Sequence, residues 1–301
     1  MRPSLLPTLL LPLTTSLALP SPRIKCPIIF DGRVSPNLTL SSFDSNSTSP
    51  FNPQYVKGEN LTWSSILLLP SSLPPSRFDI AQNSTSKPFE VTINDASLFR
   101  SYQGLQTGFR RAGLQFRDDK NVEGADAADR GVVTFHWSVR QDEARGMNLS
   151  HEYMNVWHER ADYAGNQFTF VGGVVLRQDG GDGVDSEGAR RRWTVQGAGN
   201  GVVWQTVILE GVWQNFGIRL DYGESTLQVL YSIDDEPLKE QTAAVRNNNT
   251  GGGQLQLGMA KKPTETETVV WDGYQEHIVD REGQIYGGVF VEDSSGGCVS
   301  L

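Results

Sequence analysis

The chain has 301 residues, of which 38% are hydrophobic and 20% are charged, and its formal net charge is -9. Nucleic acids and anionic membranes both attract basic surfaces, so this acidic balance argues against either as a partner. A chain of this size without a long polar tract is compatible with one large domain, because β-sandwiches and barrels commonly reach about 250 residues.

The start of the chain has the pattern of a secretory signal peptide. Met1-Arg2 is followed by a leucine-rich stretch and then by the small-residue triplet Ser16-Leu17-Ala18, which is typical of a cleavage site. Prolines interrupt the apolar stretch, which is too short for a membrane span of about 20 residues. We therefore expect residues 1–18 to be removed, residues 19–301 to form a single domain, and the protein to be secreted and extracellular.

Cysteines and glycosylation motifs fit the same compartment. Cys26 and Cys298 lie near the two ends of the mature chain, and in an oxidising compartment they predict a disulfide, with two free thiols as the alternative. Two cysteines without a Cys-x-x-Cys motif do not indicate a zinc site. The Asn-x-Ser/Thr motifs predict surface glycosylation at Asn37, Asn46, Asn60, Asn83, Asn148 and Asn248.

The segment from Leu40 to Ser86 is rich in Ser, Pro and Asn and is expected to form loops over a core. Short segments with β-branched, aromatic or alternating apolar residues follow, separated by glycine and asparagine turns, as in an all-β sandwich or jelly roll. The predicted strands are Phe89–Ile93, Gly108–Phe116, Val132–Val139, His151–His158, Gln167–Leu176, Trp193–Gln196, Val202–Leu209, Phe216–Tyr222, Leu227–Ser232, Gln254–Met259, Val269–Tyr274 and Gln284–Val291.

The densest group of chemically useful residues is His151–Glu159. On a flat strand, successive side chains point to opposite faces, so one face carries His151, Tyr153, Asn155, Trp157 and Glu159. Aromatic planes with an amide and a carboxylate suit a sugar-binding cleft. The alternative is that Tyr153 and Trp157 belong to the core.

Metal and cofactor motifs are not apparent. His151-Glu152 is followed at the fifth position by Asn155, so the His-Glu-x-x-His motif fails, and His151 and His158 fall on opposite faces. The glycines at 197–201 precede Val202-Val203 and not a helix start that could bind phosphate. We expect neither a metal nor a cofactor.

Seven separated segments resemble, in order, those of glycoside hydrolase family 131. The resemblance covers the chain from Cys26 to Cys298. It implies a β-jelly roll with an open cleft and the hydrolysis of β-1,3, β-1,6 or β-1,4 glucans of cell walls. The segments are Cys26–Arg33, Gly108–Ala112, His136–Asp142, His151–Trp157, Trp213–Gly217, Lys261–Thr264 and Gly283–Gly288.

Glycoside hydrolysis uses two carboxyl groups, one protonated and one ionised. Glu152 is the best match to a family carboxylate, and Glu159 is its rival because it shares a face with Trp157. The expected substrate contacts are Tyr153, Asn155, Trp157, Arg111, His136, Trp271 and Gln275, with a hydrogen-bonded strand histidine as the alternative for His136.

The second carboxylate is where this chain departs from the family pattern. The Gly-Phe-Arg-Arg-Ala segment of the family continues with Glu, whereas this chain has Gly113. A family histidine is likewise replaced where Trp271 follows Val269-Val270. Three hypotheses follow: a monomeric β-glucanase in which Glu276 or Glu282 replaces the lost acid, a non-catalytic glucan-binding protein, and a structural wall glycoprotein.

Overall fold

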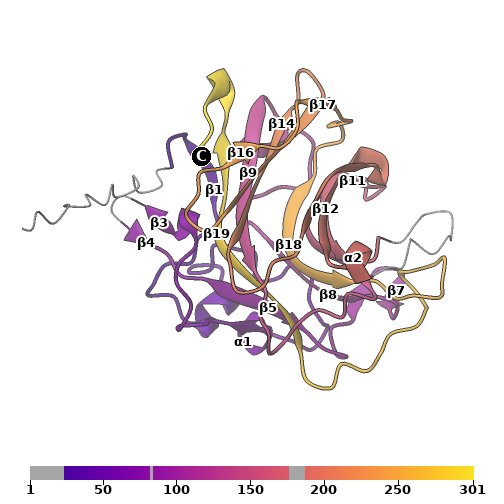
Figure 1. Ribbon diagram of the computed structural model, residues 1–301. Helices are drawn as coiled ribbons and strands as arrows, with labels where there is room; N and C mark the ends of the chain where they lie inside the picture. Colours follow the sequence, from indigo (N-terminus) through magenta and orange to yellow (C-terminus); the bar gives the residue numbers. More distant parts are fainter. Residues whose placement is uncertain (1–23, 82–83, 176–186) are drawn as a thin grey trace, which may run out of the picture.

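The computed structural model describes residues 24–81, 84–175 and 187–301 (Figure 1). Within these ranges the chain folds into antiparallel strands with two short α-helices, α1 (Trp63–Ile66) and α2 (Glu187–Arg190). The predicted signal peptide and the acceptor Asn83 lie outside the described residues. No helix in the described part of the chain is long and apolar enough to span a membrane.

Two large sheets contain most of the described strands. The larger sheet has the order β16 (Lys239–Glu240), β15 (Thr226–Ile233), β14 (Gln214–Asp221), β9 (Val132–Arg140), β19 (Glu282–Asp293), β5 (Phe89–Ile93), β2 (Leu67–Leu68), with β1 (Ile28–Asp31) on β19 and β17 (Val245–Arg246) on β15. The smaller sheet has the order β13 (Val202–Val207), β12 (Arg192–Gly197), β11 (Asn166–Gly173), β10 (Glu152–Glu159), β18 (Gln254–Lys261), β8 (Arg110–Gln115). Two hairpins lie apart, β3 (Ile80–Ala81) with β4 (Ser84–Thr85) and β6 (Phe99–Ser101) with β7 (Gly104–Gln106).

The core lies between the two sheets. Alternate residues of β9 pack against alternate residues of β11, with ring centroids 5.4 Å apart for Phe135 and Phe168 and 5.3 Å apart for Trp137 and Phe170. All four side chains are buried. This period of two buries one face of each sheet and leaves the other face free for polar side chains. We call the face of the smaller sheet that points away from the core its outer face.

The predicted all-β sandwich of the jelly-roll type is confirmed. Every predicted segment except Val269–Tyr274 coincides with a strand, within the residues described. That one prediction is wrong, because the segment forms turns: Trp271 N donates to Thr268 O, and Gly273 has a φ of +116°. A glycine adopts this conformation without the steric cost that a β-carbon adds.

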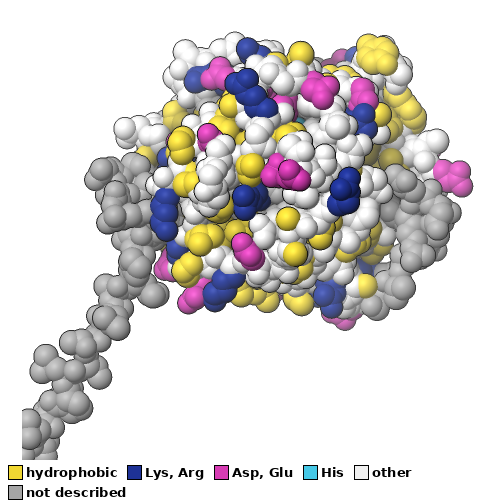
Figure 2. Space-filling model, turned by 90° about the horizontal axis from the view of Figure 1, so that it is seen from above, with side chains coloured by type: hydrophobic (Ala, Val, Ile, Leu, Met, Phe, Trp, Pro, Cys, Tyr) yellow, Lys and Arg dark blue, Asp and Glu magenta, His cyan; other side chains and the backbone are white. Residues whose placement is uncertain are grey.

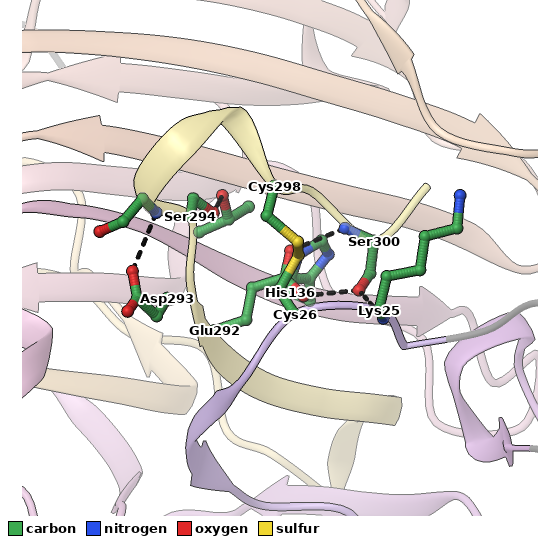
Figure 3. The surroundings of a disulfide bond; sticks show 10 residues. Lys25, Cys26, His136, Glu292, Asp293, Ser294, Cys298 and Ser300 are labelled. Carbon is green, nitrogen blue, oxygen red and sulfur yellow. Dashed lines mark hydrogen bonds and ion pairs between the residues drawn. A yellow bond between two sulfur atoms is a disulfide. The ribbon is translucent and has the colours of Figure 1, made fainter.

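The predicted disulfide between Cys26 and Cys298 is present and joins the two ends of the domain (Figure 3). Beneath it on the larger sheet, His136 Nε2 lies 2.9 Å from Glu292 Oε1, and both side chains are fully buried. Ser300 Oγ donates to Glu292 Oε2 at 2.6 Å. His136 is therefore a hydrogen-bonded strand histidine on the sheet that does not carry the other predicted contacts.

The surface carries both signs of charge. Figure 2 shows Lys and Arg side chains interspersed with Asp and Glu on the face seen from above. The acceptors Asn37, Asn46, Asn60 and Asn248 are exposed, and Asn148 is partly exposed. Their exposure is compatible with glycosylation, which stays a prediction.

Candidate functional site

A β-bulge in β10 changes which side chains share a face. The register shifts between Met154 and Val156 relative to both neighbouring strands. At this point Tyr286 Oη of β19 lies 2.9 Å from Asn155 O and 2.5 Å from Gly258 O, so it binds carbonyl groups where the ladder is interrupted. The alternation expected for a flat strand is therefore broken at Asn155.

The bulge moves Tyr153 into the core and leaves Trp157 and Glu159 on the outer face. Tyr153 is fully buried, and its hydroxyl donates to Glu282 Oε2 at 2.7 Å. It cannot stack on a sugar in this position, which corrects the expectation that it shares a face with Trp157. Asn155 is also fully buried, and its amide contacts the sulfur of Met147.

Glu159 is held by amide side chains of the neighbouring strand. Gln256 Nε2 donates to Glu159 Oε2 at 2.6 Å, and Gln254 Nε2 lies 3.5 Å from the same oxygen. The Glu159 side chain remains partly exposed. A carboxylate with one oxygen fixed by a neutral donor and with access to solvent is suitable for contact with a substrate.

Tyr55 and Arg111 lie close enough to Glu159 to interact with it electrostatically. Burial raises the pKa of Tyr55, and the charge of Glu159 raises it further, while Arg111 lowers it. Burial lowers the pKa of Arg111, against the opposite effects of Glu159 and Tyr55. An arginine stays protonated even so, so this end of the outer face contains one cation, one carboxylate and one neutral phenol.

Gly113 lies beside these groups at a position where a side chain is absent. A β-carbon added there would lie 3.0 Å from Gln256 Oε1 and 3.3 Å from Trp157 Cη2. Gln256 Oε1 is buried and has no hydrogen-bond partner among the described residues. Trp157 itself is only 1% exposed, so its ring edge borders the space at Gly113 and does not offer an open plane.

Asp119 provides a second carboxyl group near this end of the smaller sheet, where its charge also raises the pKa of Tyr55. Its Oδ2 accepts from Leu255 N at 2.8 Å. Gln115 Nε2 bonds both Asp119 O and Gln254 Oε1, at 3.1 and 3.0 Å, which connects Asp119 to the amides around Glu159. Burial raises the pKa of Asp119 well above its usual value, the Leu255 N–H lowers it, and the charges of nearby aspartates raise it. These effects favour the protonated carboxyl group.

Glu152 lies at the opposite end of β10. It is 1% exposed and forms an ion pair with Lys262. Because a strand advances about 3.3 Å per residue, Glu152 and Glu159 are separated by roughly 20 Å. The two carboxyl groups of a glycosidase are about 5–9.5 Å apart, so this pair cannot act on one bond.

Glu276 and Glu282, the expected replacements for a lost acid, belong to a charge network at that same far end. Lys261 Nζ lies 2.8 Å from Glu282 Oε1 and 3.7 Å from Glu276 Oε2. Glu276 also pairs with His151, whose Nδ1 lies 2.7 Å from Lys262 O. Burial raises the pKa of Glu276, but its hydrogen bonds and the charges of His151 and Lys261 outweigh this and hold the pKa below its usual value.

The remaining predicted contacts lie near this network. Trp271 is 38% exposed on the loop between β18 and β19. Gln275 Nε2 donates to Gly108 O and Lys261 O, at 2.9 and 3.2 Å, and so fixes the loop. The structure thus brings together Arg111, Trp157 and Glu159, and places Trp271 and Gln275 elsewhere.

Four residues of the site were not found from the sequence: Tyr55, Asp119, Gln254 and Gln256. The two glutamines had a visible signal, since Gln-Leu-Gln-Leu alternates amides with apolar residues and so puts both amides on one face. Tyr55 lies in the segment expected to be loops and carries no periodic signal. In the described part of the chain, no group of three His, Cys, Asp or Glu side chains is placed to hold a metal ion.

Comparisons with known proteins agree on one family. The family model for the glycoside hydrolase 131 catalytic N-terminal domain matches residues 28–297. A GH131 β-glucanase catalytic domain from Podospora anserina is similar, with a TM-score of 0.65 and 18% identity over 91% of this chain and 98% of that one. The catalytic domain of a glycoside hydrolase family 131 protein from Coprinopsis cinerea is also similar, with a TM-score of 0.64 and 17% identity over 91% of this chain and 97% of that one. No curated protein sequence matches.

Proposed function

The chain belongs to glycoside hydrolase family 131, and we propose that it hydrolyses β-glucans at the outer face of the smaller sheet, with Glu159 as the ionised carboxylate. The observation that supports this most directly is the partly exposed Glu159, whose Oε2 accepts from Gln256 Nε2 at 2.6 Å and whose charge acts on Arg111 and Tyr55. The substrate is a β-1,3, β-1,6 or β-1,4 glucan. Glu159 either attacks the anomeric carbon or activates water.

The proton for the leaving oxygen has to come from a second carboxyl group. We assign this role to Asp119, whose raised pKa favours the acid form and whose backbone carbonyl accepts from Gln115 Nε2, next to the amides around Glu159. General acid–base help contributes about 10²–10⁴-fold in rate. An Asp119→Asn variant should lose a factor of this size.

The experiment compares wild type, Glu159→Gln and Glu152→Gln on mixed-linkage and β-1,3-glucan, with folding checked by circular dichroism. We expect Glu159→Gln to lose about 10²–10⁴-fold in hydrolysis. Glu152→Gln serves as the matched control, since it removes a carboxylate from the other end of the same strand. If Glu152→Gln is inactive while Glu159→Gln keeps its rate, Glu152 is the working residue.

A second candidate function is glucan binding without hydrolysis. It is favoured by Gly113, next to which the buried Gln256 Oε1 has no hydrogen-bond partner among the described residues. Binding of laminarihexaose by wild type with no released sugar after prolonged incubation would support this function in place of hydrolysis.

The same proposal includes the compartment and the assembly. The protein is secreted after removal of residues 1–18, carries N-linked glycans and acts as a monomer on a polysaccharide. The disulfide Cys26–Cys298 supports an oxidising compartment. Mass spectrometry of the secreted protein, before and after glycosidase treatment, tests the cleavage site and the occupied asparagines.

A further inference from the structure

We propose that Trp271 and Tyr274 form a stacking platform that binds a β-glucan chain at the end of the smaller sheet opposite Glu159. The inference rests on the proposed function and adds a second contact region for the same substrate. It assigns recognition of longer chains to the loop between β18 and β19.

The first argument is exposure. Trp271 is 38% exposed and Tyr274 is 50% exposed, only three residues apart on one loop. Tyr102, at the tip of the β6–β7 hairpin, is 96% exposed. Thr107, directly after β7, donates its hydroxyl to Trp271 O, which joins the hairpin to the loop. Flat aromatic faces left in water are suited to contact with the C–H faces of sugar rings.

The second argument is rigidity. Asp272 accepts hydrogen bonds from the hydroxyls of Thr266 and Thr268. Tyr274 and Thr264 exchange backbone hydrogen bonds of 2.8 and 3.0 Å. The backbone that carries the two aromatic residues is therefore fixed before any ligand arrives, which lowers the entropic cost of binding.

The third argument is charge. Residues 263–280 contain no Lys or Arg, and their acidic side chains are Glu265, Glu267, Asp272, Glu276 and Asp280. Such a surface repels nucleic acids and anionic lipids. A neutral polysaccharide is the ligand class that meets both the aromatic faces and the acidic surroundings without repulsion.

The fourth argument is position. The loop follows Lys261, the last residue of β18, and it contacts Gly108 just before β8 through Val270 O. Figure 1 shows the loop beyond this end of β18 and β8, near β7. Gln256, which binds Glu159, lies five residues before Lys261 on β18, and this corresponds to roughly 17 Å along the strand. Only a chain of several sugars reaches both places.

The test measures binding of laminarihexaose and cellohexaose by titration calorimetry in a Glu159→Gln background, to prevent cleavage. Trp271→Ala and Tyr274→Ala should each weaken binding of one hexasaccharide by about 3- to 10-fold, the range expected for loss of one aromatic contact. Trp271→Phe should keep most of the affinity. Val279→Ala is the matched control, because Val279 is 87% exposed on the same loop and has no ring.

Hydrolysis of the corresponding trisaccharides, with Glu159 restored, gives the second readout. Their kcat/KM should fall much less in Trp271→Ala than the hexasaccharide affinity does, because a short substrate at Glu159 does not reach the loop. Val279→Ala should leave their kcat/KM unchanged. Equal hexasaccharide affinity in all variants overturns the platform and leaves the proposed function standing. If wild type binds the hexasaccharide through Trp271 but releases no sugar, the platform stands and the proposed hydrolysis is overturned. No binding of either hexasaccharide by wild type overturns both.

Discussion

Gly113→Glu should raise glucan hydrolysis, because it adds a carboxyl group next to Glu159. Gly113 lies within β8 and does not have a positive φ, so a side chain there adds no backbone strain. The new β-carbon lies 3.0 Å from Gln256 Oε1, the end of a flexible side chain that has to move by a few tenths of an ångström. A protonated Glu at this position can donate to Gln256 Oε1, which has no partner among the described residues.

The distance between the two acids is suitable for catalysis. The side-chain amide of Gln256 lies between Glu159 and position 113. Gln256 Nε2 lies 2.6 Å from Glu159 Oε2, and Gln256 Oε1 lies 3.0 Å from the new β-carbon. Across an amide this places Glu159 within about 8 Å of that β-carbon. A glutamate carboxyl at 113 then falls in the range of about 5–9.5 Å that glycosidases use. A general acid contributes at most about 10²–10⁴-fold in rate, or about 3–5 kcal/mol in barrier. Glu at 113 should gain part of this factor over Asp119, which is only 8% exposed.

The assay measures initial rates on mixed-linkage and β-1,3-glucan for wild type, Gly113→Glu and Gly113→Gln. Gly113→Gln is the matched control, because it has the same shape without a titratable proton. Crowding against Trp157 costs about 1–3 kcal/mol of stability in both variants, so their melting temperatures should agree. The reasoning is refuted if the two variants hydrolyse glucan at the same rate, or if wild type already reaches the rate of Gly113→Glu.

Three further predictions concern binding and stability. Trp157→Ala should weaken laminarihexaose binding in calorimetry, because the indole borders the space at Gly113, and unchanged affinity in a folded variant would make Trp157 purely structural. Replacing Cys26 and Cys298 by Ser should lower the free energy of unfolding by about 5–6 kcal/mol in urea titrations, because the bond closes a loop of 272 residues; an unchanged midpoint contradicts this. Burial raises the pKa of Glu292, but hydrogen bonds from His136 and Ser300 outweigh it and hold the pKa below 4.5. The ionised Glu292 therefore stabilises the folded state fully above pH 4.5, and this contribution is lost as the pH falls through the lower pKa of the folded state. Glu292→Gln should flatten the acid side of the plot of unfolding free energy against pH. An unchanged plot refutes this.

The strands were predictable because their periodicity is local. Phe216–Tyr222 alternates apolar with other residues, and β14 forms there, at Gln214–Asp221. Val269–Tyr274 has the same β-rich composition yet forms turns, since Asp272 binds the hydroxyls of two threonines and Gly273 adopts a positive φ. Composition alone does not show that a hydrogen-bonded turn competes with the strand.

Tyr55 and Asp119 could not be assigned to the site because their neighbours are distant in sequence. Val56 O accepts from Gly113 N at 2.9 Å, which brings the segment around Tyr55 to the free edge of β8. Asp119 reaches Leu255 N across 136 positions. Contacts of this kind depend on sheet topology, which periodicity does not specify.

The choice between Glu152 and Glu159 depended on one residue of register. Strict alternation puts Tyr153 on the face of Trp157 and Glu159, whereas the bulge at Asn155 separates Tyr153 from them. Gly258 of β18 lies at this point of the sheet and shares the Tyr286 hydroxyl with Asn155. Its φ is +151°, and a β-carbon there would lie 2.1 Å from Ala112 O of β8. The bulge does not bring Glu152 closer to Glu159, because the two remain at opposite ends of β10. A second acid for Glu159 therefore has to come from across the sheet, from Asp119 or from position 113, and not from its own strand.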